Sequence, residues 1–269
     1  MPSLSALAAL ATTFATVSGT GVLLPLYVYP SAAYNDGAAN WQPVISAISA
    51  HSSVPWQIVI NPASGPGSGG PGNGDINYES GVTQLNALPN AQTLGYVHTS
   101  YGNRAAADVE ADMTTWKTWG SPYAVDGIFL DETTTATNAA NATYLSAVVA
   151  FAKSTFGNAA PVVCNFGTAA PAAYYSVCDE LVVFEGSLAD YDGTATLAAS
   201  VPKGSEAGQA VVLVHDFSGA GATLAALEGY VHDLKAAGVG WGYFTSGGYD
   251  SVTAGVATVG NVGGAFYSA

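Results

Sequence analysis

Asp126-Gly127-Ile128-Phe129-Leu130-Asp131-Glu132 is a short apolar run that ends in two adjacent carboxylates. A short apolar run of this kind is typical of a strand in the interior of a protein. Acidic side chains at the end of such a strand lie at the edge of the core, where a substrate can reach them. We therefore expect Asp131 and Glu132 to mark an active site.

The same pattern recurs at intervals of roughly thirty residues, the length of one strand–helix–strand unit. Eight apolar runs predict strands at Val22–Tyr29, Trp56–Ile60, Thr93–Val97, Gly127–Leu130, Pro161–Cys164, Leu181–Phe184, Val211–Val214 and Gly240–Phe244. Ala, Leu and Val at three- and four-residue spacing predict helices between most of them, such as Asn40–His51, Ala105–Trp119, Ala142–Phe156 and Thr223–Ala237. This alternation over 269 residues predicts an α/β fold, a single (β/α)8 TIM barrel.

An open, doubly wound sheet is the structural alternative. Such a sheet normally carries a phosphate-binding turn after its first strand, whereas Tyr29-Pro30-Ser31 follows the first predicted strand here. Gly65–Gly74 is rich in glycine but has neither G-x-G-x-x-G at the start of a helix nor a G-K-[ST] ending. We interpret this segment as a mobile loop over the mouth of the barrel.

The composition is acidic, with 5 Lys and Arg against 19 Asp and Glu and a formal net charge of −14. A protein of this charge is not expected to bind nucleic acid or an anionic membrane, because both partners are themselves negative. A neutral or cationic partner fits better. Most of the acids also have an ordinary explanation, since surface carboxylates keep an extracellular protein soluble.

The N-terminal segment differs from the rest of the chain. Leu4–Val17 is apolar, rich in Ala and too short to span a bilayer, and the small residues Ser18-Gly19-Thr20 follow it. This pattern predicts a signal peptide at residues 1–19 and a catalytic domain at 20–269. Asn141-Ala142-Thr143 is a glycosylation sequon, which is usable only in a secreted chain. We expect a secreted, extracellular monomer without a transmembrane segment, either released or associated with the cell wall.

Cys164 and Cys178 are the two cysteines, and a secreted chain with an even count normally pairs them. The predicted barrel speaks against this pair. Cys164 lies at the top of the fifth strand, and Cys178 precedes the sixth strand at the bottom. At ~3.3 Å per residue these levels differ by more than about 10 Å, beyond the reach of a disulfide. The sequence leaves the pairing open.

Polar side chains occupy nearly every predicted strand end, which is where a barrel builds its active site. In chain order they are Tyr27, Tyr29, Asn61, His98, Asp131, Glu132, Asn165, Glu185, His215, Asp216 and Thr245. Tyr101 follows the third strand and joins them as an aromatic ring on which a sugar can pack. We predict Asp131, Glu132 and Glu185 as catalytic residues and the others as substrate-binding residues.

Two carboxylates from different strands are what the cleavage of a glycosidic bond requires. One protonates the leaving oxygen, and the other attacks the anomeric carbon or activates water. Residues with metal-ligand spacing, H-E-x-x-H and G-x-S-x-G are all absent from the sequence, so we expect neither a metal nor a cofactor nor acyl-transfer chemistry. The sequence therefore predicts a glycoside hydrolase.

Four ordered motifs resemble the spherulin-4 (spherulation-specific family 4) glycoside hydrolases. They are Val22–Pro30, Ile60–Gly67, Gly95–Gly102 and Gly127–Glu132, and the resemblance runs from about Gly21 to the C-terminus. It implies a (β/α)8 barrel that hydrolyses α-1,4-linked galactosamine and N-acetylgalactosamine within galactosaminogalactan, a fungal cell-wall and biofilm exopolysaccharide. By motif, the essential carboxylates of the family fall on Asp131, Glu132 and Glu185. The D-G-x-D-x-D-x-E strand of chitinases is similar too, but Phe129 replaces its middle acid.

Several roles stay open at this point. We assign Asp131 as nucleophile or base and Glu185 as proton donor, while Asp131 and Glu132 can exchange roles. Adjacent residues of a strand point to opposite faces, so both acids face the barrel axis only if the chain turns sharply at Glu132. Retention or inversion depends on the separation of the carboxyl groups. The alternative function is a non-catalytic cell-wall or spore protein that binds glycan with the same residues.

Overall fold

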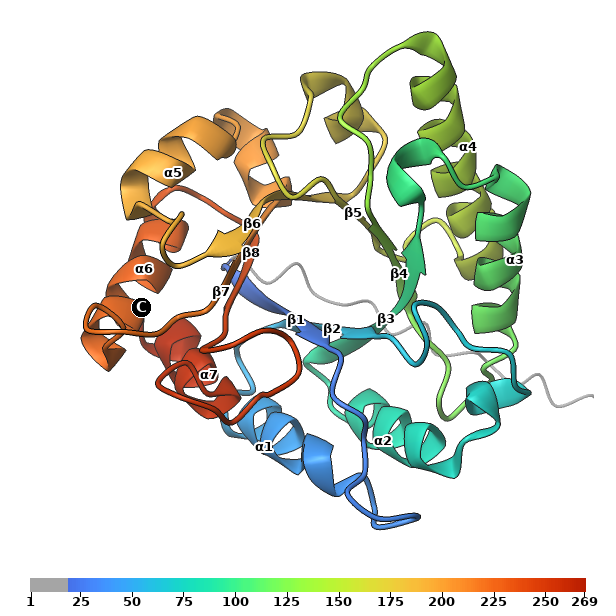
Figure 1. Ribbon diagram of the computed structural model, residues 1–269, viewed down its shortest axis with the longest axis horizontal. Helices are drawn as coiled ribbons and strands as arrows, with labels where there is room; N and C mark the ends of the chain where they lie inside the picture. The colour runs from blue at the N-terminus through green and yellow to red at the C-terminus, as the bar shows by residue number, and fades with distance from the viewer. Residues whose placement is uncertain (1–18) are drawn as a thin grey trace, which may run out of the picture.

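The computed structural model describes residues 19–269, so the predicted signal peptide lies outside the described residues except for Gly19. Eight parallel strands form a closed barrel in the order in which they occur along the chain (Figure 1). They are β1 (Gly21–Leu26), β2 (Trp56–Ile60), β3 (Ala91–His98), β4 (Gly127–Asp131), β5 (Val162–Asn165), β6 (Glu180–Ser187), β7 (Ala210–His215) and β8 (Trp241–Phe244). The prediction of a TIM barrel is confirmed, and the open sheet is excluded.

Helices surround the barrel as a ring (Figure 1). They are α1 (Gln42–Ala50), α2 (Ile76–Asn86), α3 (Ala106–Lys117), α4 (Ala139–Phe156), α5 (Gly193–Ser200), α6 (Leu224–Ala236) and α7 (Val259–Ser268). The four helices that the sequence predicts correspond to α1, α3, α4 and α6. Between β5 and β6 the chain forms a short 3₁₀ helix at Ala172–Ser176 in place of an α-helix.

The strands are buried on both faces, as parallel strands covered by helices must be. Every residue of β1 and β2 is buried, which explains why their sequences are continuous apolar runs rather than alternating ones. An acidic residue lies at each end of β4. Asp126 accepts a hydrogen bond from the Thr93 amide at 2.8 Å at the base, and Asp131 ends the strand at the top. Gly127 is required where β4 meets β5, because a Cβ there would collide with the Pro161 carbonyl.

Cys164 and Cys178 form a disulfide, with their Cα atoms 6.1 Å apart. The separation expected from the sequence is therefore wrong. β5 is only four residues long, and its Cys164 pairs in register with Leu181, three residues after Cys178. The Asp179 amide also donates to the Val162 carbonyl, so the chain reaches the level of β5 before β6 begins. The disulfide closes the one crossover of the barrel that has no α-helix.

We expect the disulfide to contribute about 3 kcal/mol to the free energy of unfolding, because it closes a loop with a sequence separation of 14 residues. Replacing both cysteines with Ala should lower the midpoint of urea unfolding accordingly. The oxidised and reduced wild-type protein provide a matched comparison. An unchanged midpoint in both experiments would mean that the crossover is held by its packing alone.

Gly65–Gly74 follows β2 at the mouth of the barrel and is folded back on itself. A Cβ at Gly69 would collide with the Asn73 carbonyl, and a Cβ at Gly67 or Gly72 would meet the side chain of Asn73 or Glu79, so glycine allows this close packing. The predicted place of the loop is confirmed, and its glycines serve close packing. Across residues 19–269, no helix combines the length and the apolar character that crossing a membrane requires.

Candidate active site

Unusual backbone conformations gather at the carboxyl ends of the strands. Among residues 19–269, eight residues other than glycine have a positive φ, and all lie in loops that follow β1, β2, β3, β4 or β7: Asn35, Ala38, Ser64, Asn73, Ser100, Tyr101, Glu132 and Asp216. Such conformations are unfavourable for residues with a Cβ and are often found at functional sites. We therefore expect the active site at this end of the barrel.

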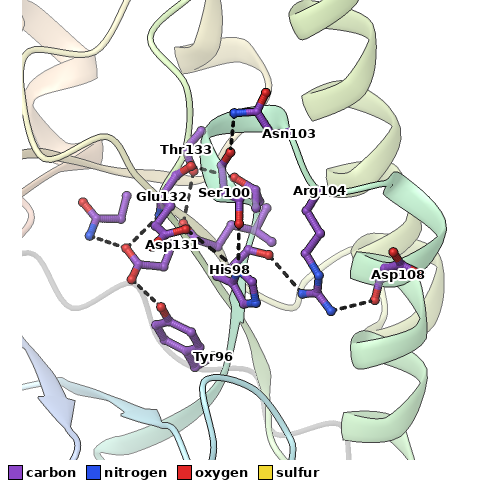
Figure 2. Close-up of polar contacts among 12 residues, drawn as sticks. Tyr96, His98, Ser100, Asn103, Arg104, Asp108, Asp131, Glu132 and Thr133 are labelled. Carbon is purple, nitrogen blue, oxygen red and sulfur yellow. Dashed lines mark hydrogen bonds and ion pairs between the residues drawn. The ribbon is translucent and has the colours of Figure 1, made fainter.

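The Asp131 carboxylate is anchored at this end of the barrel by three hydrogen bonds. Its Oδ2 accepts a hydrogen bond from the Tyr96 hydroxyl at 2.6 Å, and its Oδ1 accepts from the Asn165 side chain and from the Glu132 amide, both at 2.8 Å. In Figure 2, Tyr96 points at the Asp131 carboxylate, while Arg104 is turned away toward Asp108. Three donors hold Asp131 in one orientation.

Glu185 faces Asp131 across Asn165. The Asn165 Nδ2 donates to Glu185 Oε2 at 2.6 Å as well as to Asp131 Oδ1 at 2.8 Å. Because both oxygens lie within these distances of one nitrogen, they are at most 5.4 Å apart. Tyr249 donates to the other oxygen of Glu185, Oε1, at 2.8 Å. The structure thus brings together the two acids that the sequence places on different strands.

Glu132 lies on the rim next to His98. Its φ of +55° supplies the sharp turn that two adjacent acids need in order to share one end of the barrel. The Glu132 carbonyl accepts hydrogen bonds from the Tyr101 amide and the Thr99 hydroxyl, both at 2.7 Å, which fix this turn. The Oε2 atom of Glu132 is 3.8 Å from His98 Nδ1, and that nitrogen is 3.1 Å from the Ser100 hydroxyl. Glu132 and His98 can therefore bind one substrate group together.

Three tyrosines line the carboxylate pair. The Tyr27 ring packs edge-on against Tyr96 and Tyr249, with ring centres 5.8 and 5.7 Å apart. Burial raises the pKa of Tyr27 well above its ordinary value, and the charges on Asp131 and Glu185 raise it further. Burial and the nearby carboxylates likewise raise the pKa values of Tyr96 and Tyr249. All three hydroxyls keep their protons at neutral pH, and those of Tyr96 and Tyr249 donate to Asp131 and Glu185.

His215 and Asp216 form a pair at the end of β7. Asp216 Oδ2 is 2.7 Å from His215 Nδ1, and the His215 ring centre lies 6.3 Å from that of Tyr249. Asp216 is itself one of the residues with positive φ. The pair is partly exposed beside the Glu185 side of the site, so the predicted role of both residues in substrate binding stays a prediction.

The other predicted binding residues lie farther from the acids. Tyr29 donates to Asp75 Oδ2 at 2.7 Å on an exposed part of the rim. Asn61 accepts from the Gly65 amide and organises its own loop. Tyr101 is 63% exposed, and Thr245 is buried with its hydroxyl donating to the Gly248 carbonyl. Tyr29 and Tyr101 are exposed, while the side chains of Asn61 and Thr245 form hydrogen bonds within their own loops, so the predicted role of all four in substrate binding stays a prediction.

Tyr96 and Tyr249 donate hydrogen bonds to the two acids and are not among the predicted site residues. Tyr96 lies two residues before His98 on β3, so alternation places both side chains on the inner face. Inspecting inner-face positions below the strand ends would have found it. Tyr249 comes from the loop after β8, and no periodicity indicates how that loop folds back over Glu185. Within the described part of the chain, no group of three or more His, Cys, Asp or Glu side chains is arranged to hold a metal ion.

Comparison with known proteins identifies the family. The sequence model of spherulation-specific family 4 matches residues 21–262. The chain belongs to this family. It is 38% identical over 165 residues to Spherulin-4 from Physarum polycephalum, and the match covers 61% of this chain but only 44% of that relative. The chain thus spans less than half of the length of this member of the family.

Solved structures show the same architecture. Aspergillus clavatus Sph3, solved in complex with GalNAc, superposes with a TM-score of 0.80 at 28% identity, covering 93% of this chain and 98% of that one. A family GH18 chitinase from Chromobacterium violaceum superposes with a TM-score of 0.51 at 13% identity, covering 93% and 83% of the two chains, and shares the fold alone. The chain has a glycoside hydrolase fold, which supports a role in binding or hydrolysing glycans.

Proposed function

We propose that the protein is a secreted endo-acting glycoside hydrolase that cleaves α-1,4-linked galactosamine and N-acetylgalactosamine in a galactosaminogalactan-type exopolysaccharide. The observation that carries this proposal is the pair of carboxylates from β4 and β6 that share the Asn165 side chain. A protein that only binds glycan has no need to hold two acids this close, because their charges repel each other. Family membership and the GalNAc bound to Sph3 support the choice of sugar.

The spacing of the pair favours a mechanism that retains the anomeric configuration. Retaining enzymes hold their carboxyl groups about 5–5.5 Å apart, and inverting enzymes about 6.5–9.5 Å. The two oxygens that Asn165 joins, Asp131 Oδ1 and Glu185 Oε2, are at most 5.4 Å apart, which supports the closer spacing of the first class. An acetamido-assisted route does not suit an α-linked sugar, because the assisting oxygen lies on the side of the leaving group. The nucleophile is therefore assigned to the protein.

In the first step, Asp131 attacks the anomeric carbon while the Glu185 carboxylic acid gives its proton to the leaving glycosidic oxygen. A covalent glycosyl–Asp131 ester forms, and the chain portion beyond the cleaved bond leaves with a new hydroxyl. In the second step, the Glu185 carboxylate takes a proton from water. The resulting attack on the anomeric carbon frees Asp131 and restores protonated Glu185. Glu132 and His98 orient the sugar from the rim.

The distribution of charge fits a substrate with cationic amino groups. Nine of the 19 acids lie at strand ends or in the loops that follow them: Asp36, Asp75, Asp131, Glu132, Glu185, Asp190, Asp192, Asp216 and Asp250. All four lysines lie toward the opposite end of the barrel, at or after the C-terminal ends of helices: Lys117, Lys153, Lys203 and Lys235. Deacetylated galactosamine is cationic near neutral pH, so it is attracted to the end that carries these nine acids and no lysine.

Hydrolysis with retention is the expected result when purified protein is incubated with galactosaminogalactan. New reducing ends should appear with this polymer and not with chitosan, and proton NMR should show the α-anomer first because α-linked chains are cleaved with retention. A fully N-acetylated sample of the polymer tests whether cleavage requires free amino groups, since this sample has none. The β-anomer as first product would contradict the retaining mechanism. Binding without cleavage would favour the glycan-binding alternative.

A further inference from the structure

We propose that Asn165 is a positioning residue that sets the distance between the two catalytic carboxylates, rather than a residue that binds substrate. This inference rests on the proposed function and assigns Asn165 a role within it. Asn165 ends β5, the strand that lies between β4 and β6. The residue therefore stands between the strand that carries Asp131 and the strand that carries Glu185.

Both amide hydrogens of the Asn165 side chain are used within the protein. Its nitrogen has two hydrogens. One is donated to Asp131 Oδ1 at 2.8 Å and the other to Glu185 Oε2 at 2.6 Å. Its oxygen accepts from the Gly167 amide at 2.9 Å, and the whole residue is only 7% exposed. A substrate thus finds no free donor on Asn165, which argues against the binding role expected from the sequence.

The backbone around Asn165 is held as firmly as its side chain. The Asn165 carbonyl accepts from the Thr133 amide at 2.8 Å, which ties it to the loop that carries Asp131 and Glu132. On the other side, the Phe166 amide donates to the Val182 carbonyl of β6 at 3.2 Å. Both neighbouring strands are fixed to this point. A donor with so little freedom can define where two acceptors lie.

Asparagine suits this position because its side chain is neutral and its amide group donates two hydrogens. Lys or Arg would also donate to both carboxylates, but the positive charge would form an ion pair with the acids that the reaction needs. Ser carries one hydroxyl hydrogen and can donate to only one of the two acids. Asp would add a third carboxylate to the pair. The neutral amide holds the two acids near each other without forming an ion pair with either.

The experiment is a series at Asn165 with a matched control. Asn165→Ser and Asn165→Ala leave one and no side-chain donor, and Asn158→Ala removes an exposed amide before β5, at the opposite end of the barrel. We expect kcat to fall about 10-fold for Ser and about 100-fold for Ala, with KM changed less than about 3-fold, because small misplacement of catalytic groups has effects of this size. The acidic limb of the pH profile of kcat/KM should shift in both Asn165 variants. It should stay in place in Asn158→Ala.

Two results would overturn the assignment. A rise in KM at constant kcat would make Asn165 a binding residue. A loss of activity that parallels a drop in melting temperature, with an unchanged pH profile, would make it a structural residue. Carboxyl ¹³C NMR provides a readout that does not depend on activity. The carboxyl carbon signals of Asp131 and Glu185 should both move in Asn165→Ala, because each carboxylate loses its hydrogen bond from Nδ2. An inactive wild-type protein would refute the proposed function, and this measurement would still decide the role of Asn165.

Discussion

Replacing Asp131 with Asn is expected to lower kcat on galactosaminogalactan by at least about 10³-fold, because the variant lacks the nucleophile that forms the glycosyl ester. Asn has nearly the shape of Asp, and its side-chain oxygen can still accept the hydrogen bond from Tyr96. KM should therefore change little. The measurement is the initial rate of reducing-end formation, with melting temperature as evidence of folding.

Asp192→Asn is the matched control for this variant. Asp192 is an exposed acid in the loop after β6, and its substitution also removes one negative charge from the acidic end of the barrel. It should leave kcat within about 2-fold of the wild-type value. If Asp131→Asn retained more than a tenth of the wild-type kcat, Asp131 would not be the nucleophile, and Glu132 would become the candidate for that role.

Glu185→Gln separates the acid from the nucleophile. It should lose activity on the polymer by about 10²–10⁴-fold, because Gln cannot protonate the leaving oxygen. An aryl oligosaccharide of the same sugar, whose leaving group needs no proton, should restore most of the rate of the first step. Added azide should then accelerate the second step and yield a glycosyl azide. The Asp131→Asn variant should show neither rescue.

The fold was predictable because each strand is a short apolar run in the sequence, separated from the next run by a polar or helical segment. Parallel strands buried on both faces give continuous runs such as Trp56–Ile60, whose bounds agree with β2. The crossover between β5 and β6 was not predictable in this way. Its 3₁₀ helix has no periodicity of its own, and the closeness of Cys164 and Cys178 depends on strand register, which no local pattern gives.

The candidate site was predictable at the strand ends and not below or beyond them. Asp131, Glu185 and Asn165 end or nearly end their strands, so the barrel rule alone places them at one edge. The sequence does not indicate that Asn165 donates one amide hydrogen to each of the two acids, because this depends on side-chain geometry. Tyr96 was not predicted as a site residue because it lies one pleat below the end of β3. Tyr249 was not assigned to the site because it belongs to an irregular loop.

Replacing Glu180 with Gln is expected to stabilise the protein, most strongly at alkaline pH. Glu180 begins β6 at the base of the barrel, and burial raises the pKa of its carboxyl from 4.5 to about 8, with a smaller rise from Asp179. Gln57 and Trp241 favour the charged form, as does Lys153, but burial outweighs them. The side chain is therefore a neutral carboxylic acid at pH 7.

The hydrogen bonds of Glu180 point to the location of this proton. Gln57 Nε2 donates to Glu180 Oε1 at 2.9 Å. The remaining oxygens of the two groups, Glu180 Oε2 and Gln57 Oε1, are buried and have no hydrogen-bond partner among residues 19–269. A proton on Glu180 Oε2 donated to Gln57 Oε1 satisfies both atoms at once, as in a paired acid and amide. A charged Glu180 would leave the Gln57 oxygen unsatisfied, which is unfavourable in the interior.

The direction of the pH dependence follows from the raised pKa. Below pH 4.5 the carboxyl is protonated in the folded and the unfolded chain, and its contribution to stability is fully present. Between pH 4.5 and about 8 only the unfolded chain releases the proton, so the free energy of unfolding falls by roughly 1.4 kcal/mol per pH unit. Above pH 8 both states are ionised, and the loss is complete.

Glu180→Gln should remove this loss, because Gln keeps the acceptor for Gln57 Nε2 and offers an amide hydrogen to Gln57 Oε1. We expect the variant to exceed the wild type by about 3 kcal/mol in the free energy of unfolding at pH 7 and to equal it near pH 4. Urea unfolding between pH 4 and pH 9 measures the difference, and Glu206→Gln, at an exposed acid on the same side of the barrel, is the control. A variant that is less stable than the wild type by the same amount at every pH would show that Glu180 is ionised and paired in the folded protein, and the proton between Glu180 and Gln57 would not exist.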